Sequence, residues 1–381
     1  MDIERRFSCI ARMEEAAQRR IPRFAWDYMS GGIGRETVLA ENCRRLDRVK
    51  LRPRYLVDDA ESPDLSHALL GTSYPLPFGV APLGLSGLIW PKAAEHLARA
   101  ARDKGISFAL SSLATSSIEQ IGAIGGNIWY QHYATVDNDI NADLLQRAQN
   151  AGFDTLVVTV DIPTATRRDR DIRNGLSVPP EFNLRTLLDI LQCPAWALSM
   201  LRHGVPEFAS IKPYLPAHLS LAQLGLHLSG LIEGHVSLDK LRWYRAQWPA
   251  KLIVKGLLDA RDAAACIDIG VDAIVVSNHG GRQLDAAQTA LDALPAIRHV
   301  VGGDFPLLAD GGIRNGLDIA RYLAMGADFV LLGRAFMFAL GAIGADGAGH
   351  AMTVLQKELG STLGQLGCPS IRRLPEFLIR E

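Results

Sequence analysis

The chain has 381 residues, of which 48% are hydrophobic and 21% charged, and its formal net charge is −1. This near-neutral balance gives no general attraction to nucleic acid or to an anionic membrane, so we expect no nucleic-acid partner. The five cysteines are far apart and form no C-x-x-C pair, which indicates no metal site and no disulfide framework. No signal peptide is visible, and no stretch reaches the ~18 uninterrupted apolar residues of a membrane-spanning helix. We therefore expect a protein of a reducing compartment, either soluble or bound to a surface.

The first 75 residues are expected to form a helical cap. Pro22 in a first helical turn and Gly31-Gly32 as a stop predict one helix, and a second is predicted from Thr37 to Val49. Two such helices cannot form a core alone. They should therefore pack on the domain that follows.

From residue 76 to about 340, short apolar runs alternate with helical stretches. The expected strands are Phe78–Ala81, Ser107–Leu110, Ile128–Tyr133, Thr155–Val160, Leu252–Val254, Ala273–Ser277, Pro306–Ala309 and Asp328–Leu332. The clearest expected helices are Ala93–Lys104, Ile140–Ala151, Ala260–Ile269 and Gly316–Met325, each followed closely by a glycine that would end it. Eight strands alternating with helices predict an α/β fold, the TIM (β/α)8 barrel, with a doubly wound open sheet as the alternative. Residues 341–381 should add C-terminal helices, including Met352–Leu363.

One interval breaks this rhythm, because about ninety residues separate Val160 from Leu252. A single helix with two loops would need roughly thirty. We therefore expect an insertion at about residues 175–236, after the fourth strand and at the catalytic end of the barrel. Its segment 186–201 is rich in Leu and contains Trp196. It is either a lid or subunit contact, or a segment lying in a membrane interface.

The stretch Ala273–Asp285 carries the strongest chemical signal in the chain. A short buried strand runs into Ser277-Asn278-His279-Gly280-Gly281-Arg282, so a histidine and an arginine follow a strand end among glycines. The pattern predicts a base beside a carboxylate-binding guanidinium. Asp161, at the end of the fourth strand, is a candidate partner for the imidazolium of His279.

Two other groups of strand-end residues predict ligand contacts. Glycine-rich turns carrying Arg314 and Arg334 follow the seventh and eighth strands, the usual place of a phosphate site in such barrels. Lys255 ends the fifth strand and is either a Schiff-base nucleophile or a fixed cation beside a cofactor. These residues alone leave the reaction open.

The nine residues Ser277–Asp285 resemble the signature of the FMN-dependent (S)-2-hydroxy-acid dehydrogenases and oxidases. Further stretches resemble that family in the same order: Asp27-Tyr28, Leu51–Arg54, Thr159–Asp161, Arg168 with Asp171, Leu252–Gly256, Asp310–Arg314 and Gly333-Arg334. The resemblance covers nearly the whole chain. It implies FMN as the cofactor and oxidation of a 2-hydroxy acid to the 2-oxo acid as the reaction.

The resemblance also implies a role for each candidate residue. His279 would be the catalytic base with Asp161 as its partner, and Tyr133 would bind the substrate hydroxyl. Arg282, Arg168 and Tyr28 would bind the substrate carboxylate, while Lys255 would stabilise negative charge at the flavin N1–C2=O edge. The implied cofactor-binding residues are Ala81, Pro82, Leu83, Gly84, Ser111, Gln131, Thr159, Lys255, Ser277, Asp310, Gly311, Gly312, Arg314, Gly333 and Arg334. His279 would take either the α-proton or the hydroxyl proton, and the sequence leaves both mechanisms open.

Within the family, the stretch Pro82–Lys92 and the insertion are most similar to the membrane-associated mandelate dehydrogenase branch. This similarity favours a dehydrogenase that passes electrons to a quinone, a cytochrome or another carrier. The alternatives are an oxidase that uses O2 and produces hydrogen peroxide, and a different FMN barrel enzyme such as an isomerase or lyase. A non-catalytic barrel is disfavoured because Lys255, His279 and Arg282 are all present. The resemblance further implies a homotetramer in the cytoplasm, with peripheral attachment to the inner membrane through residues 186–201 left open.

Overall fold

The computed structural model describes residues 2–56, 62–175, 184–216 and 230–379. Within them, eight parallel strands close into a barrel in chain order, with β10 paired to β3, so the prediction of a barrel is confirmed and the open-sheet alternative is wrong. The strands are β3 (Phe78–Val80), β4 (Ser107–Ser111), β5 (Asn127–His132), β6 (Thr155–Thr159), β7 (Lys251–Leu257), β8 (Ala273–Val276), β9 (Leu307–Asp310) and β10 (Phe329–Leu332). All eight expected strands occur, and the largest difference is at β7, which extends to Leu257.

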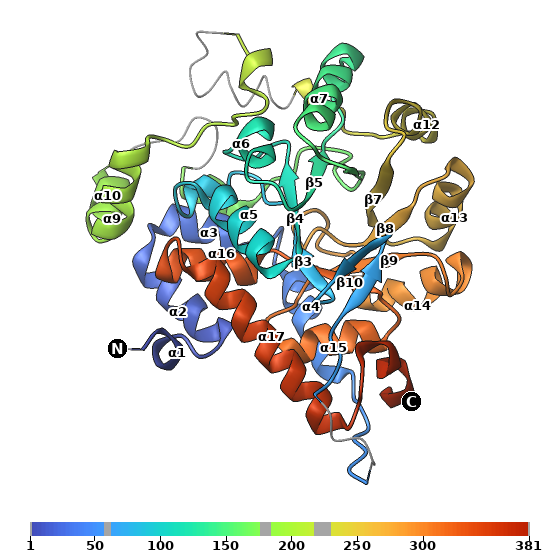
Figure 1. Cartoon of the computed structure of the whole chain (residues 1–381). Helices are drawn as coiled ribbons and strands as arrows, with labels where there is room; N and C mark the ends of the chain where they lie inside the picture. The colour runs from blue at the N-terminus through green and yellow to red at the C-terminus, as the bar shows by residue number, and fades with distance from the viewer. Residues whose placement is uncertain (1, 57–61, 176–183, 217–229, 380–381) are drawn as a thin grey trace.

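Helices surround the barrel (Figure 1). They are α5 (Ala93–Lys104), α6 (Ile118–Gly122), α7 (Asn138–Asn150), α12 (Leu238–Gln247), α13 (Ala260–Ile269), α14 (Ala290–Val301), α15 (Gly316–Ala324) and α16 (Arg334–Ile343). Helices α5 and α13 have the predicted bounds. They end at Gly105 (φ 68°) and Gly270 (φ 82°), in the left-handed region that glycine adopts without steric cost.

An antiparallel hairpin of β1 (His67–Leu69) and β2 (Thr72–Tyr74) lies before the barrel and was not predicted. Leu69 and Tyr74 pack into the barrel interior with Trp129, and the rings of Tyr74 and Phe329 lie 5.3 Å apart. The hairpin therefore covers the N-terminal end of the barrel. A cavity lies at the other end of the barrel, where the strands finish.

The N-terminal helices are α1 (Ile3–Arg6), α2 (Ile10–Arg20), α3 (Arg23–Ser30) and α4 (Thr37–Arg48), and α17 (Gly347–Leu366) lies near the C-terminus. Helix α2 packs closely on α16, because a Cβ on Gly341 would lie only 3.0 Å from the Cβ of Ala17. Loop α3–α4 reaches the strand-end face, where the backbone N–H of Ile33 donates to the carbonyl of Gly281 at 3.1 Å. Short 3-10 helices cover Ser86–Leu88 (η1), Lys212–Tyr214 (η2) and Ile371–Phe377 (η3).

The segment after β6 contains α8 (Asp169–Arg173), α9 (Leu184–Leu191) and α10 (Pro194–His203), of which α9 and α10 project from the body at the left of Figure 1. Pro194 is the first residue of α10, as expected for a proline in a first helical turn. The indole N–H of Trp196 donates to the carbonyl of Leu88 at 3.0 Å and fastens this pair of helices to the body. Residues 176–183 and 217–229 of the predicted insertion lie outside the described residues.

Candidate active site

A cavity of about 500 Å3 opens at the C-terminal ends of the strands. Most of the predicted site residues line it: Tyr28, Ala81, Pro82, Leu83, Gly84, Tyr133, Thr159, Arg168, Lys255, His279, Arg282, Asp310, Gly311, Gly312, Arg314, Gly333 and Arg334. Four others, Ser111, Gln131, Asp161 and Ser277, lie behind this lining and have little or no exposed surface. The structure therefore brings together, in one place, residues from the N-terminal cap and from all eight strand ends.

His279 and Asp161 form a close pair at the edge of this cavity. The Nδ1 atom of His279 lies 2.9 Å from Oδ1 of Asp161. Burial alone would raise the pKa of Asp161, but the charge and hydrogen bond of His279, together with Lys255, lower it. Because an ionised Asp161 accepts the Nδ1 proton, Nε2 of a neutral His279 is left free to accept a proton from a ligand.

The backbone of His279 is held in an unusual conformation. His279, Gly280 and Gly281 all have positive φ, at 55°, 63° and 76°. The left-handed region costs a non-glycine residue about 1–3 kcal/mol and persists only where the surroundings enforce it. Here the Oγ of Ser277 accepts the backbone N–H of His279 at 3.0 Å. The two glycines thus allow the turn, and the strained backbone of His279 directs its side chain into the cavity.

Lys255 is the centre of a buried polar network. Its Nζ donates to Oγ of Ser277 at 2.9 Å and lies 3.0 Å from Oδ2 of Asp310, while Ser277 donates to Oδ1 of Asp310 at 2.6 Å. Burial favours the neutral amine, but Asp310 and Asp161 outweigh it and raise the pKa of Lys255. A lysine held in its charged form is a poor nucleophile. The geometry therefore favours the fixed cation over the Schiff base.

Arg282 and Arg168 approach the same tyrosine from the cavity wall. Their guanidinium carbons lie 5.1 Å and 5.9 Å from the ring centre of Tyr28. Burial and then the repulsion of Arg168 lower the pKa of Arg282. Nη1 of Arg282 donates to the carbonyls of Tyr28 and Gly31. Nη1 of Arg168 pairs with Asp171 at 3.2 Å, and Nη2 of both arginines has no partner among the described residues. Two neighbouring cations with free donors make a site for a carboxylate, which would relieve their repulsion.

Tyr133 lies on the same wall. Burial and then the charge of Asp161 raise the pKa of its phenol. The hydroxyl therefore stays protonated and can donate a hydrogen bond to a ligand oxygen.

The other end of the cavity is also positively charged. Arg334 donates from Nε, Nη1 and Nη2 to the carbonyls of Met29, Gly280 and Gly31 at 3.1, 2.8 and 2.8 Å. Its pKa is lowered well below the usual value by burial and then by Arg282 and Arg314. In the part of the chain that the structure describes, neither Arg314 nor Arg334 forms an ion pair with a carboxylate. Helix α16 also begins here, at Arg334, so an anion such as a phosphate would be stabilised.

Two buried polar side chains between these ends have no partner. Both polar atoms of the Gln131 carboxamide and Oγ1 of Thr159 make no hydrogen bond, although Gln131 is fully buried. A buried polar group left unpaired costs about 1–3 kcal/mol, so these atoms fit a ligand with hydrogen-bonding edges. A flavin ring with a phosphate tail matches this donor set: unpaired amide and hydroxyl in the middle, Lys255 beside them, and Arg314 and Arg334 at the end.

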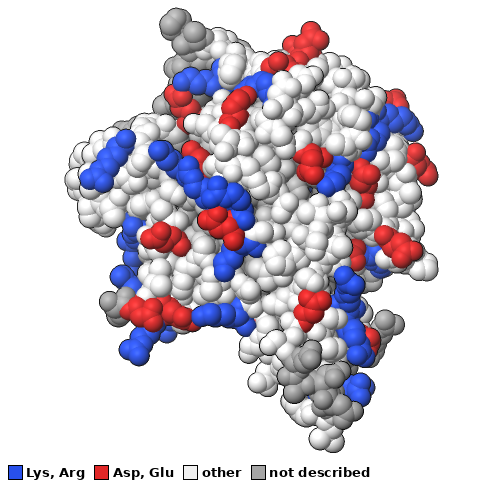
Figure 2. All heavy atoms as spheres, viewed as in Figure 1, with Lys and Arg blue, Asp and Glu red and all other residues white. Residues whose placement is uncertain are grey.

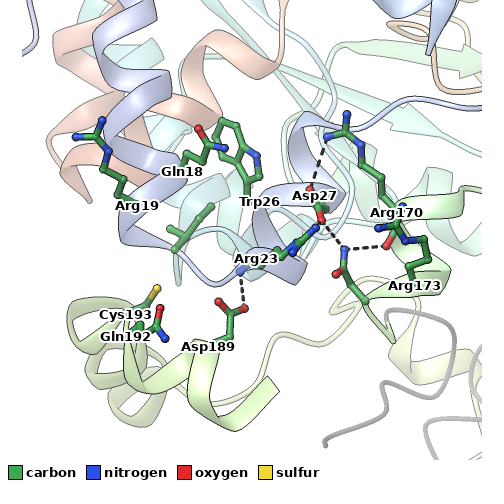
Figure 3. Close-up of a pocket in the computed structure, with 12 residues that line it drawn as sticks. Gln18, Arg19, Arg23, Trp26, Asp27, Arg170, Arg173, Asp189, Gln192 and Cys193 are labelled. Atoms are coloured by element: carbon green, nitrogen blue, oxygen red, sulfur yellow. Dashed lines mark hydrogen bonds and ion pairs between the residues drawn. The ribbon is translucent and has the colours of Figure 1, made fainter. Parts of the chain in front are cut away.

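Helix α8, which carries Arg168 at its start, is fixed from behind by α3. Asp27 lies 3.6 Å from Nη1 of Arg170 and accepts from Nδ2 of Asn174 at 2.5 Å (Figure 3). The backbone N–H of Arg23 donates to Asp189 of α9 at 2.6 Å. These contacts line a second cavity of about 670 Å3 between α2, α3, α8 and α9. Most of the charged groups that line this cavity pair with one another. We therefore interpret these pairs as structural contacts that hold α8 in place.

Sequence reasoning missed several residues around the active-site cavity, among them Phe208 and Asn42. Phe208, within the insertion, lines it. Asn42 of α4 is buried and exchanges two side-chain hydrogen bonds with Asn278, next to His279. A signal for Asn42 was available, because Val38, Asn42 and Leu46 share one face of a helix and a polar residue on an apolar stripe needs a buried partner.

Comparisons with known proteins agree with this geometry. Residues 17–381 match the family model of the FMN-dependent dehydrogenases. The chain is 37% identical over 366 residues to (S)-mandelate dehydrogenase of Pseudomonas putida, covering 96% of this chain and 92% of that protein. It is 38% identical over 369 residues to an L-lactate dehydrogenase of Caulobacter vibrioides, covering 96% of both. A solved structure of a monotopic membrane protein, (S)-mandelate dehydrogenase, superposes with a TM-score of 0.93 at 35% identity, covering 98% of this chain and 99% of that one. A mandelate oxidase structure gives a TM-score of 0.83 at 32% identity, covering 98% of both.

Proposed function

The chain belongs to the family of FMN-dependent dehydrogenases, and on that premise we propose that it oxidises an (S)-2-hydroxy acid with a mandelate- or lactate-like side chain. It is an oxidoreductase, its cofactor is FMN, and its reaction converts a 2-hydroxy acid to the 2-oxo acid. The observation that carries the proposal is that His279, paired with Asp161 behind it, lines the same cavity as Arg282 and Arg168. A base beside two carboxylate-binding cations suits this substrate class.

In this proposal the chain's own residues orient and deprotonate the substrate. Arg282 and Arg168 bind the carboxylate, and the Tyr133 hydroxyl donates to the substrate hydroxyl. Nε2 of His279 accepts the proton, and Asp161 stabilises the imidazolium that results. The two-electron oxidising chemistry would be supplied by FMN when it is bound. Lys255 supplies a fixed positive charge close to the position of the ring.

His279 can take either of two protons. Removal of the α-proton would leave a carbanion-like substrate, whereas removal of the hydroxyl proton would accompany hydride transfer. Both routes use His279 as the base and Arg282 and Arg168 as the residues that bind the carboxylate. Solvent and substrate deuterium isotope effects measured separately and together distinguish a stepwise route from a concerted one.

The electron acceptor is the finer part of the proposal. We propose a quinone or another carrier, with O2 as the alternative, because the relatives include both dehydrogenases and an oxidase. Gly84 lies against the substrate end, and a Cβ there would find ordinary contacts of 3.6 Å and longer. Space alone therefore does not force glycine at this position, where oxidases of the family often carry alanine.

The experiment that tests the function is anaerobic titration of the flavin absorbance with (S)-mandelate, (S)-lactate and glycolate, followed by air. Bleaching by one of them establishes the reaction and narrows the substrate. Slow return of colour in air supports a carrier-linked dehydrogenase, and fast return with hydrogen peroxide supports an oxidase. A flavin that none of the acids bleaches would contradict the proposed substrate class.

We also propose that α9 and α10 attach the protein to a membrane surface. Their outer faces expose large apolar side chains, with Leu191 66% and Leu201 83% exposed, and Leu187 and Leu188 lie beside Leu191 on α9. The projecting lobe is mostly uncharged in Figure 2. No helix of the described residues is long and apolar enough to cross a membrane. Exposed leucines on two packed helices suit insertion into an interface.

Co-sedimentation with phospholipid vesicles tests this attachment. Replacing Leu187, Leu191 and Leu201 together by Asp should release the protein into the supernatant while flavin reduction stays unchanged. The matched control replaces three exposed apolar residues elsewhere, Ile267, Val300 and Leu317, by Asp. Equal vesicle binding by both variants would contradict the assignment. The homotetramer and the cytoplasmic location remain predictions, and light scattering after size exclusion tests the first.

A further inference from the structure

We propose that Asn42, a residue of the N-terminal cap, positions the catalytic base by gripping the loop that follows β8. Asn42 is 1% exposed. Its Nδ2 donates to Oδ1 of Asn278 at 3.1 Å, and Nδ2 of Asn278 donates back to Oδ1 of Asn42 at 2.8 Å. The inference rests on the proposed function, since it concerns the residue that takes the proton.

Asn278 is the hub of the loop that Asn42 grips. Its Oδ1 also accepts the backbone N–H of Gly281 at 3.2 Å, and its own carbonyl accepts the same N–H at 3.0 Å. Its Nδ2 donates to the carbonyl of Gln288 at 3.2 Å. The orientation of the Asn278 carboxamide therefore fixes the backbone at Gly281, while Oγ of Ser277 accepts the backbone N–H of His279. Without Asn42, the carboxamide loses one donor and one acceptor partner in a buried place.

The loop needs this grip because the backbone of His279, a non-glycine residue, is held in the left-handed region at a φ of 55°. Gly280 and Gly281, which follow it, adopt that region without steric cost. A backbone of this kind keeps its shape only where several contacts agree on it. If the turn relaxes, the ring of His279 moves relative to Asp161 and to the substrate, and small misplacements of a base slow proton transfer steeply.

Helix α4 contacts the loop through Val38, Leu39 and Asn42, and among the described residues of α4 it is the side chain of Asn42 that hydrogen-bonds the turn. Asp285, at the loop's end, accepts the backbone N–H groups of Arg35 and Val38 at 2.8 and 3.0 Å. On the neighbouring turn after β9, a Cβ on Gly312 would lie 2.4 Å from the backbone oxygen of Asn42. Helix α4 is thus wedged between the two turns. We infer that the Asn42–Asn278 pair couples the packing of α4 against these turns to the position of His279.

A purely structural amide pair would lower stability without a specific change at the base. Arg45 provides the matched control, because it lies on the same helix and its Nε donates to Asp292 of α14 at 2.8 Å, away from the turn. The variants Asn42→Ala and Arg45→Gln should both lower the melting temperature. Only Asn42→Ala should affect the turn.

Two measurements on the FMN-loaded protein test the proposal. In Asn42→Ala, amide hydrogen exchange across residues 277–285 should accelerate about tenfold or more, with no change in Arg45→Gln. Anaerobic flavin reduction by the best 2-hydroxy acid should slow about tenfold to a hundredfold, with the substrate KM changed little. The double variant Asn42→Ala/Asn278→Ala should be no slower than Asn278→Ala, because both act through one pair.

If Asn42→Ala does not fold, Asn42→Ser keeps a small polar side chain but is too short to make both hydrogen bonds, and it should show the same changes to a smaller degree. Wild-type exchange and wild-type reduction in the Asn42 variants, or additive losses in the double variant, would overturn the proposal. A wild-type flavin that no 2-hydroxy acid reduces would overturn the proposed function instead. In that case, amide hydrogen exchange would be the one measurement that tests whether Asn42 holds the turn.

Discussion

Replacing Asp161 by Asn tests the core of the site, because it keeps the shape of the side chain and removes its charge. Asp161 and His279 are 2.9 Å apart between Oδ1 and Nδ1, which places the charges about 4 Å apart once the imidazole is protonated. At an effective dielectric constant of about 20, this attraction is about 4 kcal/mol, or about half of that when the proton is half transferred. The expected loss in the rate of flavin reduction is therefore about 30-fold to 1,000-fold.

The assay is anaerobic stopped-flow absorbance of the flavin at saturating 2-hydroxy acid. The substrate KM should change little, since Arg282 and Arg168 bind the carboxylate and Asp161 lies behind the cavity lining. The control variant is Asp169→Asn, which removes a carboxylate that is 66% exposed and pairs with Arg173. A reduction rate of Asp161→Asn within threefold of the wild type would refute the role of this carboxylate.

Three further predictions concern the barrel and its ends. Replacing Lys255 by Met leaves Asp310 buried without its cation, so urea denaturation should show about 3–5 kcal/mol less stability, and adding Asp310→Asn should restore part of it. Replacing Gly312 by Ala puts a Cβ 2.4 Å from a backbone oxygen at a φ of 80°, so fluorescence titration should show FMN affinity at least about tenfold weaker. Burial lowers the pKa of His132 from 6.5 to about 4, so the unfolded chain binds an extra proton between these values. Stability should therefore fall by about 3 kcal/mol as the pH drops from 6.5 to 4, and urea midpoints of His132→Gln should fall less; equal pH slopes would contradict this.

The barrel itself could be predicted from the sequence because its signals are local. Each strand is a short apolar run buried on both faces, and helices such as α5 and α13 end at glycines that leave the helical conformation. The hairpin β1–β2 escaped prediction because three-residue strands are too short to show a period. Its place is set by Leu69 and Tyr74 filling the barrel end, which is a contact of the folded state.

The candidate site divides in the same way. Since parallel strands end on one face, a lysine near the end of a strand and a histidine and three arginines that follow strands had to converge there, and the sequence alone determined that much. It could not show that Ser277 links Lys255 to Asp310, or that Asn42 meets Asn278 across 236 residues of chain. The first pairing depends on how neighbouring strands of the barrel align, and the second on how the cap packs on the barrel, and only the tertiary structure decides either. Strand order and residue chemistry follow from the sequence. The distances that shift the pKa of Lys255 or hold His279 in position arise only where remote segments meet.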